Sequence, residues 1–543
     1  MRLPRLARAR MLPALLCVGV VFGAGVPDVD AQTTDDTAPL VLTLDRAVRV
    51  AMQNNFDLQG ASLDVDEARA QVREVRGQVL PQVNVNGSYT RNVVTANPFA
   101  GSDIGSFLGG GNQSDWVAFN ERRRQDGDPA TEPISFDQFQ QRLADSLATS
   151  GINVQSGGDP FNVDNEFLGS VEVTQTLYNG SAFSALRGAK QFQDVSRLAR
   201  VRQAQQVAND VYEAFYQAIL AEERARVVAQ RLERTDATLQ EIKAQVRQGV
   251  VPKFQRLSAE VERSNTQTEL IRVRNDADRA VDNLKRTLGM DADAPVRLDG
   301  ALDTPSVRDG LQQISTADAV GQAYTNRVDL KRARLAIELE GIQRNAVRAE
   351  YFPTLSAFAT FNYFGRVPDN RTQILTTNPQ NVNDPFFFDS RERGFFDDEF
   401  WNPALSVGVR MQWNIFNGFQ TSSRMQQRTI AVERATLQAQ QLQQAIAIEV
   451  RGARRALLNA QQRIQSQSQN VDRAEINYEY TAQRVGEGVS SPLELREASD
   501  QLDQSRLNYL QAVYDYLVAR SDLQTAMGMP LSAVDDELQM TKR

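Results

Sequence analysis

Cysteine and histidine are almost missing from this sequence. The 543 residues contain one cysteine, Cys17, and no histidine. Cys17 lies inside an apolar N-terminal run, and Leu16 before it is not the small residue that a lipoprotein signal needs, so lipidation is not expected. Disulfides, cysteine-based metal sites and histidine acid–base chemistry are therefore excluded, and no cofactor or metal ion is expected.

Long apolar runs are scarce as well, apart from the N-terminus. Residues 11–26 are mostly apolar, four arginines precede them, and Val29-Asp30-Ala31 has the small-residue pattern of a cleavage site. Residues 1–31 are therefore predicted to be a secretory signal peptide. Beyond them no apolar run reaches the roughly 18 residues of a membrane-spanning helix, so any membrane crossing is expected to use strands.

Positive charge is also in the minority. The chain has 60 Lys and Arg against 68 Asp and Glu, and without residues 1–31 the balance is 56 to 66, or −10. An acidic chain is a poor ligand for nucleic acid, so no nucleic-acid partner is expected. Glycine and proline are sparse, and the dominance of Gln, Arg, Ala, Glu and Asp favours long exposed helices.

The sequence contains two halves with the same order of motifs. Four pairs of segments match: 43–59 with 315–331, 75–90 with 347–363, 171–180 with 407–418, and 287–291 with 526–530. Each half reads as helices, a proline, a strand, a loop, a second strand, Asn-Gly, a very long helix, a glycine turn and a long helix. One architectural unit is therefore predicted twice, over 32–300 and 301–543, with long hairpins at 180–289 and 418–528.

Four segments alternate between apolar and polar residues, as strands with two different faces do. They lie at about 82–91, 169–178, 354–364 and 404–416. The last is the clearest, because every odd position from Leu405 to Ile415 is apolar, whereas Phe358 interrupts the polar side of the third. A soluble sandwich would also alternate.

The residue types in these segments favour a membrane over a sandwich core. Ser, Thr and Asn dominate the polar sides, and Tyr89, Tyr363 and Trp413 occupy the positions of an interfacial girdle. Lengths of about ten residues suit a tilted bilayer span. Four strands alone cannot close a barrel and open edges are not tolerated in lipid, so copies of the chain are expected to pool their strands.

Very long helices are predicted between the strands and the glycine turns. Residues 182–246 contain no proline and as one helix would be about 98 Å long. Apolar residues recur every seven positions, as in helices packed side by side. They include Ala204, Val211, Ala218 and Leu239 in the first half and Val450, Leu457 and Ile464 in the second. The helices predicted at 252–288 and 328–351 have a combined length close to that of the long helix. A long helix is therefore expected to lie beside two shorter helices that are stacked end to end.

These motifs together resemble the TolC-type outer-membrane efflux protein family, also called outer membrane factors. The resemblance covers essentially the whole chain after residue 31. Its carriers are the two-fold repeat and the segments "YFPTLS" at 351–356, "WNIFNGF" at 413–419, "RQGVVP" at 247–252 and "GEGVSSP" at 486–492. It implies a mainly α fold with a membrane β-barrel, in which a homotrimer forms twelve outer-membrane strands and a tunnel of helical hairpins in the periplasm.

The resemblance also implies a function and partners. The family forms the outer-membrane exit duct of tripartite efflux pumps or type I secretion systems, docked to a periplasmic adaptor (membrane fusion protein) and an inner-membrane transporter. A periplasmic coiled-coil adaptor or scaffold is the alternative, although it leaves the four strands unexplained. An enzyme is not expected, because carboxylate pairs such as Asp397-Asp398 come without histidine, a nucleophile motif or a phosphate loop.

The resemblance places the adaptor-contacting tips at two glycine turns. They are Gln248-Gly249-Val250 and Glu487-Gly488-Val489, in which a polar residue replaces the valine that the family has before the glycine. Both glycines are also explained as helix C-caps that need a positive φ.

The family's pore constriction maps onto Glu494 and Glu497, six and nine positions beyond Gly488. In three copies these carboxylates would attract cations, although a solvated acidic turn is the alternative. The Tyr and Arg that latch the closed mouth in the family are replaced by Val485 and Ser490, so closure is expected to use other groups such as Arg484 or Lys253.

Two loops, 92–168 and 365–403, are longer than the family needs, and long loops are often functional. The second is rich in aromatic residues. We hypothesise that it covers the outer mouth of the channel, in which case deleting 380–400 raises single-channel conductance and an unchanged value removes the idea.

Overall fold

The computed structural model describes residues 39–93, 113–128, 132–149, 163–302, 310–369, 371–376 and 388–529. The predicted signal peptide and parts of both long loops lie outside these residues. Within them the chain is mainly helical, with long helical hairpins attached to a small sheet, which confirms the predicted fold class of one chain.

The two halves share six elements in the same order, which confirms the duplicated repeat. In the first half these are α1 (Leu44–Asn54), α2 (Phe56–Gly77), β2 (Gln82–Arg91), β3 (Asn165–Tyr178), α6 (Gly180–Arg247) and α7 (Lys253–Leu288). In the second they are α9 (Thr316–Asn326), α10 (Val328–Arg348), β5 (Thr354–Val367), β8 (Trp401–Gln412), α11 (Gln420–Gly486) and α12 (Pro492–Ala526). The remaining elements are β1 (Leu40–Leu42), α4 (Gln113–Asp126), α5 (Phe136–Thr149), β4 (Val296–Leu298), α8 (Gly310–Gln313), a 3-10 turn η1 (Ala349–Tyr351), β6 (Thr372–Thr376) and β7 (Phe388–Glu392).

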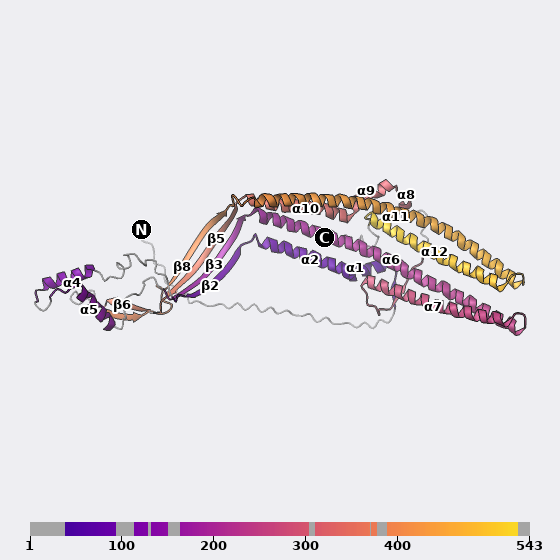
Figure 1. The fold of residues 1–543 in the computed structure, drawn as a ribbon, viewed down its shortest axis with the longest axis horizontal. Helices are drawn as coiled ribbons and strands as arrows, with labels where there is room; N and C mark the ends of the chain where they lie inside the picture. Colours follow the sequence, from indigo (N-terminus) through magenta and orange to yellow (C-terminus); the bar gives the residue numbers. More distant parts are fainter. Residues whose placement is uncertain are drawn as a thin grey trace, which may run out of the picture.

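The molecule is elongated, and its sheet and helices follow one another along the long axis (Figure 1). The helices extend from one end of the sheet to two hairpin tips, whereas α4, α5 and β6 lie beyond the other end. No helix within the described residues is both long enough and apolar enough to span a membrane.

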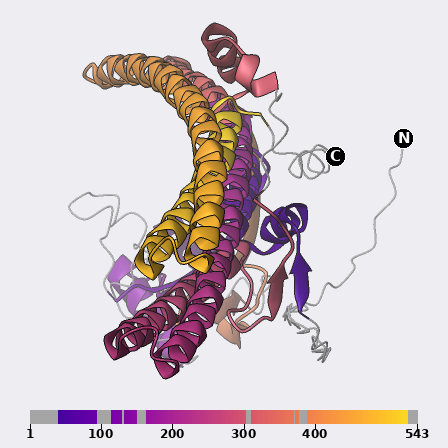
Figure 2. The same ribbon diagram turned by 90° about the vertical axis from the view of Figure 1, so that its right-hand side faces the viewer.

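The long helices pack beside pairs of shorter ones, as the helix lengths predict. α6 contacts α2 and α7, and it also contacts α10 and α12, while α11 contacts α10 and α12. With 68 residues, α6 is about 100 Å long. Seen from its right-hand end in Figure 1, the helical part is a curved layer in which α11 forms one side (Figure 2).

The apolar residues that recur every seven positions lie in the interfaces between helices. In the first half Ala204, Val211, Ala218 and Leu239 are buried, and in the second half Val450 and Leu457 are buried. Among the described residues two large cores result, one around α1, α6 and the end of α7, the other around α9, α11 and α12. A smaller cluster of Val228, Leu270 and Val273 lies between α6 and α7. Burial of these apolar stripes, rather than local propensity, therefore holds such long helices in place.

Two glycine joints lock the shorter helices end to end. α7 stops at Gly289, whose φ of +67° is left-handed, and a Cβ there would lie 2.2 Å from the Asn54 carbonyl oxygen. α12 is followed by Gly528, with φ +66°, where a Cβ would lie 2.9 Å from the Arg327 nitrogen. Glycine is required at both places because of the backbone conformation and the close approach.

The same joints are closed by side chains that donate to carbonyl groups. In the first, Asn55 Nδ2 donates to the Thr287 carbonyl at 2.8 Å. In the second, Arg327 Nη1 donates to the equivalent Ala526 carbonyl at 3.3 Å and also pairs with Glu449 at 2.6 Å. The buried charge of Arg327 is therefore neutralised within its own joint.

Gly289→Ala is expected to lower the thermal unfolding midpoint of the detergent-solubilised protein much more than Gly488→Ala does. Both positions have a left-handed φ, which costs alanine about 1–2 kcal/mol. Only Gly289 is also crowded, because no atom lies within 4 Å of a Cβ at Gly488. Equal losses in the two variants would show that the joint relaxes around the added methyl group.

The main sheet has the strand order β2-β3-β5-β8, and all three pairings are antiparallel. β2 pairs only with β3, and β8 pairs only with β5, so within the described residues both outer edges are left without a partner strand. A second small sheet pairs β1 with β4 beside the first core, and β6 pairs with β7 beyond the main sheet.

The last strand differs from its predicted extent of about 404–416. β8 begins at Trp401 and its final pair joins Gln412 to Thr354. Pairing stops there because the preceding residue on the partner side is Pro353, which has no backbone donor. The apolar alternation continues to Ile415, which is exposed and lies outside the sheet.

In the first long loop, α4 and α5 form a small hairpin held by aromatic contacts. Trp116 meets Phe136, and Phe119 meets Phe139, each pair with ring centroids 5.5 Å apart. Asn120 both donates to and accepts from the backbone of Ile134, which fixes the connection between the helices.

Candidate functional site

The two hairpin tips have the same backbone geometry. At the first, the Val250 N–H donates to the Gln245 carbonyl at 3.0 Å, and at the second the Val489 N–H donates to the Arg484 carbonyl at 2.9 Å. Gly249 and Gly488 have φ values of +73° and +75°. These are Schellman C-caps, so the conformational role that the sequence predicts for both glycines is confirmed.

The predicted tip residues are exposed at the end of the molecule (Figure 1). Val250 and Val489 are 69% and 66% exposed, and Gln248 and Glu487 beside them are also exposed. Each tip thus presents one apolar and one polar side chain on a rigid turn, which is a usable contact surface for another helical protein.

Glu494 and Glu497 lie in the first turns of α12 and are both exposed. Ser491 caps this helix, because its Oγ accepts from the Glu494 N–H at 3.4 Å and lies 3.2 Å from Glu494 Oε1. The Glu494 carboxylate thus also takes part in capping α12, because it accepts from the Ser491 hydroxyl. Neither glutamate lines the cavity between the two hairpins.

That cavity lies near the tips and has a volume of about 740 Å³. Residues of all four hairpin helices line it, with apolar side chains such as Ile242, Phe254 and Leu495 beside arginines and carboxylates. The two hairpins are thus incompletely packed here, and charged groups bridge the gap.

Two arginines of α6 make bridging ion pairs. Arg231 lies 2.6 Å from Asp500 of α12 and 3.2 Å from Glu262 of α7. Arg234 pairs with Asp503 of α12. These contacts join the α6–α7 hairpin to the α11–α12 hairpin near the tips, whereas neither Arg484 nor Lys253 makes an ion pair with another described residue.

Asp503 is the most buried carboxylate of this group, with a side chain that is 5% exposed. Burial raises the pKa of its carboxyl, and the guanidinium groups of Arg234, Arg231 and Arg506 lower it by less, so the pKa lies above its ordinary value. Its Oδ2 atom has no hydrogen-bond partner among the described residues. The charge of Asp503 is thus supported chiefly by Arg234.

At the opposite end, the sheet has two chemically different faces. The apolar face consists of alternate residues: Val83, Val85 and Tyr89 of β2, Phe167, Val171 and Val173 of β3, Ala359, Phe361 and Tyr363 of β5, and Trp401, Leu405, Val407, Val409 and Met411 of β8. The pairing aligns them in rows across all four strands, for example Val83, Val173, Ala359 and Val407. This face is solvent-exposed in the single chain, with Val407 76% exposed.

The polar face carries Asn, Ser and Thr together with Glu172 and Arg410, and also the apolar Leu168 and Phe364. Phe358, the apolar exception in the sequence, packs against Gly408, where a Cβ would come within 2.9 Å of its ring. The Arg410 guanidinium lies 5.1 Å from the centre of the same ring. A cation–π contact with Arg410 thus stabilises the Phe358 ring on the polar face.

The family described as outer membrane efflux protein matches residues 146–290 and 319–529. The chain belongs to this family. Its resemblance to the TolC-type proteins is thereby confirmed, and with it the assignment to outer-membrane efflux and transport.

Solved structures of outer-membrane channels share the fold of this efflux protein. The CmeC channel of Campylobacter jejuni is 13% identical, with 92% of this chain and 89% of that chain covered and a TM-score of 0.65. VceC of Vibrio cholerae is 14% identical over 90% and 96% of the chains, with a TM-score of 0.63. CusC is 16% identical over 90% and 92%, with a TM-score of 0.62. The chain therefore has the fold of these outer-membrane proteins.

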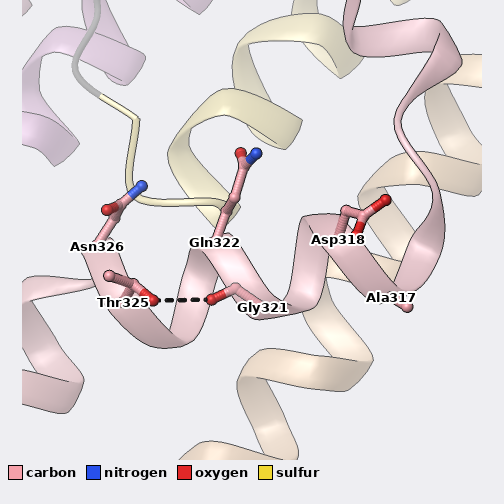
Figure 3. A pocket seen from close by; sticks show the side chains of 6 residues that line it. All are labelled: Ala317, Asp318, Gly321, Gln322, Thr325 and Asn326. Atoms are coloured by element: carbon pink, nitrogen blue, oxygen red, sulfur yellow. Dashed lines mark hydrogen bonds between the residues drawn. The ribbon is translucent and has the colours of Figure 1, made fainter.

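A second hollow of the efflux protein, about 450 Å³, lies along α9. It is lined by Ala317, Asp318, Gly321, Gln322, Thr325 and Asn326, all from one helix (Figure 3). Thr325 Oγ1 donates to the Gly321 carbonyl at 3.1 Å, and the Asp318 carboxylate accepts from Ser315 at 2.6 Å. The only carboxylate of this hollow is thus engaged in capping its own helix. Elsewhere too, within the part of the chain that the structure describes, no group of three or more metal-binding side chains occurs.

The ion pairs between the hairpins are the feature of this efflux protein that sequence reasoning missed. A signal for them exists, since Arg234 precedes the tip glycine Gly249 by the same spacing at which Asp503 follows Gly488. In two hairpins of the same geometry, equal distances from the tips put opposite charges at the same height.

Proposed function

We propose that this efflux protein is the outer-membrane exit duct of a tripartite efflux pump or type I secretion system. It conducts substrate passively, and a partner in the inner membrane supplies the energy. The observation that carries this proposal is the combination of an exposed apolar sheet face at one end with helices of about 100 Å that lead away from it.

The dimensions of the apolar face support its placement in the outer membrane. Trp401 and Trp413 flank it, twelve residues apart, which corresponds to about 40 Å along an extended chain. At a tilt of about 45° this gives a height near 28 Å, close to the apolar band of outer-membrane barrels. The helices then extend into the periplasm as a tunnel.

Both sides of the chain support assembly into a ring of three. β2 and β8 are open sheet edges, and the helices on the same two sides expose large apolar residues. On the α2 and α7 side these are Phe56, Leu63, Leu257 and Val261, and on α11 they are Ile430, Leu437, Ile448, Ile476 and Tyr480. Because the two edges differ, they join head to tail, and rotation closes the ring. Closure pairs every strand edge within the lipid.

The repeat specifies which residues meet at the interface between copies. Within the chain, Gln191 of α6 donates to Glu338 of α10 at 2.8 Å. In the other half, Thr429 follows Gly418 at the same spacing at which Gln191 follows Gly180. Likewise, Asp66 precedes Pro81 at the same spacing at which Glu338 precedes Pro353. We expect Thr429 of one copy to face Asp66 of the next.

A Thr429→Cys, Asp66→Cys double variant is therefore expected to form disulfides between copies in the membrane. The chain after residue 31 has no other cysteine, so the two single variants are clean controls. Gel electrophoresis without reductant checks the result. Closed rings limit the products to covalent dimers and trimers, whereas a ladder of longer products or monomer alone would contradict the ring.

The tips and the acidic residues of α12 complete the proposal. Exposed Val250 and Val489 are the contacts for a periplasmic adaptor, which links the duct to an inner-membrane transporter. Glu494 and Glu497 of three copies form the constriction at the periplasmic mouth. The Arg231 and Arg234 ion pairs hold the two hairpins together there and keep the mouth narrow.

Ion conduction tests the duct itself. The purified trimer, inserted in planar bilayers, is expected to give long-lived current steps of uniform size. Disulfide-linked trimers that insert but pass no current, even with the hairpin ion pairs removed, would contradict a duct while leaving the ring intact.

A further inference from the structure

The turn at residues 393–400, here called the aromatic turn, connects β7 to β8 in the second long loop. It is anchored by backbone bonds, because the Arg366 N–H donates to the Phe400 carbonyl at 2.8 Å and the Phe400 N–H to the Asp397 carbonyl at 2.9 Å. Trp401 Nε1 donates to the Phe395 carbonyl at 2.9 Å. The turn therefore has a defined position relative to the sheet.

Two of its three phenylalanines, Phe395 and Phe396, pack on the apolar face of the sheet. Phe396 stacks on Trp401 with ring centroids 5.9 Å apart, and Trp401 stacks on Tyr363 at 5.3 Å. Phe395 meets Phe167 edge-on at 5.5 Å. Phe167, Tyr363 and Trp401 all belong to the apolar face, so the turn continues that face instead of reaching across the polar one.

A glycine makes room for this cluster. Gly365 pairs with Trp401, and a Cβ at Gly365 would lie 2.5 Å from the indole ring. The indole thus lies flat over the β5 backbone, and from there it reaches Phe167 of β3 at 5.5 Å. Tyr89 of β2 extends the cluster by its contact with Phe167 at 4.9 Å. Aromatic rings therefore cover all four strands at this end.

The outermost ring of the cluster, that of Phe396, is exposed to solvent. Phe396 is 80% exposed, although its backbone is fixed and its neighbours are stacked. The following residues Asp398 and Glu399 are exposed acids. Aromatic and charged residues thus adjoin in one turn at the end of an apolar surface, which is the chemistry of a boundary between hydrocarbon and water.

We infer that the aromatic turn is a lipid anchor, in which Phe396 inserts into the interfacial region of the outer leaflet while Asp398 stays in water. This inference rests on the proposed function, because the apolar face must itself contact lipid. For Phe395 and Phe396, this inference replaces the expectation that the aromatic part of the second long loop covers the outer mouth of the channel. A lipid surface fits better than a protein partner because the cluster is continuous with the whole apolar face.

Depth-dependent fluorescence quenching tests the anchor. Phe396→Cys, Asp398→Cys and Val407→Cys each supply one thiol for a polarity-sensitive probe on the full chain, reconstituted as trimers in phosphatidylcholine vesicles. Lipids brominated near the headgroup or deep in the acyl chain, and iodide in the water, are the quenchers. Val407 matches Phe396 in exposure, with 76% against 80%, and reports on the apolar face itself.

The expected result is quenching of the probe at 396 by shallow bromine, of that at 407 by deep bromine, and of that at 398 by iodide. If 407 is quenched by lipid while 396 responds to iodide as 398 does, the anchor is overturned and the membrane placement survives. If 407 also responds only to iodide, the proposed function fails. Phe396→Trp, which keeps an aromatic ring, provides the same test in a variant with Trp413→Phe and Trp116→Phe. Its emission is read as the difference from the otherwise identical protein, which retains only Trp401.

Discussion

Asp503→Ala is expected to raise the single-channel conductance and the open time of the duct more than any other change at the tips. The substitution removes the partner of Arg234 and leaves a guanidinium that is only 25% exposed. Breaking such a pair costs about 3 kcal/mol, the lower end for buried pairs because Arg234 keeps some contact with water. A loss of that size shifts the balance between packed and separated hairpins by about a hundredfold.

Planar bilayer recordings check this expectation, with Asp276→Ala as the matched control. Asp276 pairs with Arg272 and Arg279 of its own helix and joins no two hairpins. The reversed pair, Arg234→Asp with Asp503→Arg, is expected to restore low conductance. If Asp503→Ala conducts as the parent does, or if the reversed pair stays open, the ion pair does not hold the mouth.

Val407→Arg is expected to abolish assembly in the outer membrane, whereas Ser406→Arg leaves it largely intact. The two residues are adjacent in β8 and face opposite sides of the sheet, because side chains alternate along a strand. An arginine on the lipid face near the bilayer centre costs about 2–4 kcal/mol. Three copies multiply that cost, while an arginine on the polar face stays in water.

The amount of heat-resistant trimer in the outer-membrane fraction measures this effect. Val407→Ala serves as the control, since it removes side-chain volume without adding charge. Equal losses for the two arginine variants would show that both faces are enclosed by protein, and the duct proposal would then lose its membrane contact.

The periodicities of the sequence were enough to predict the fold of one chain. A seven-residue apolar repeat selects helices that pack side by side, and a two-residue repeat selects strands with two faces. Pro81 and Pro353 end the helices before the first strand of each half, and Gly249 and Gly488 end the long helices at the tips. These signals are local, so they can be recognised in a sequence without any knowledge of tertiary contacts.

Strand ends and charged contacts were not predictable in the same way. The alternation from Leu405 to Ile415 placed the last strand too far along the chain, because pairing depends on where β5 begins and not on the pattern of β8 itself. The backbone geometry of the tips was predictable, because Gly249 and Gly488 follow the pattern of helix C-caps. The ion pairs of Arg231 and Arg234 were not, because their partners come from other helices.

The sequence alone determined the long helices and the four main strands, the duplication, the acidic balance of charge and the absence of histidine, because each of these follows from residue type and spacing along the chain. Only the tertiary structure decided that Arg234 meets Asp503, 269 residues away, and that Phe395 and Phe396 pack on the apolar face of the sheet. Such contacts depend on how helices and strands are stacked in space. Residues far apart in the chain carry no local signal of the distance between them.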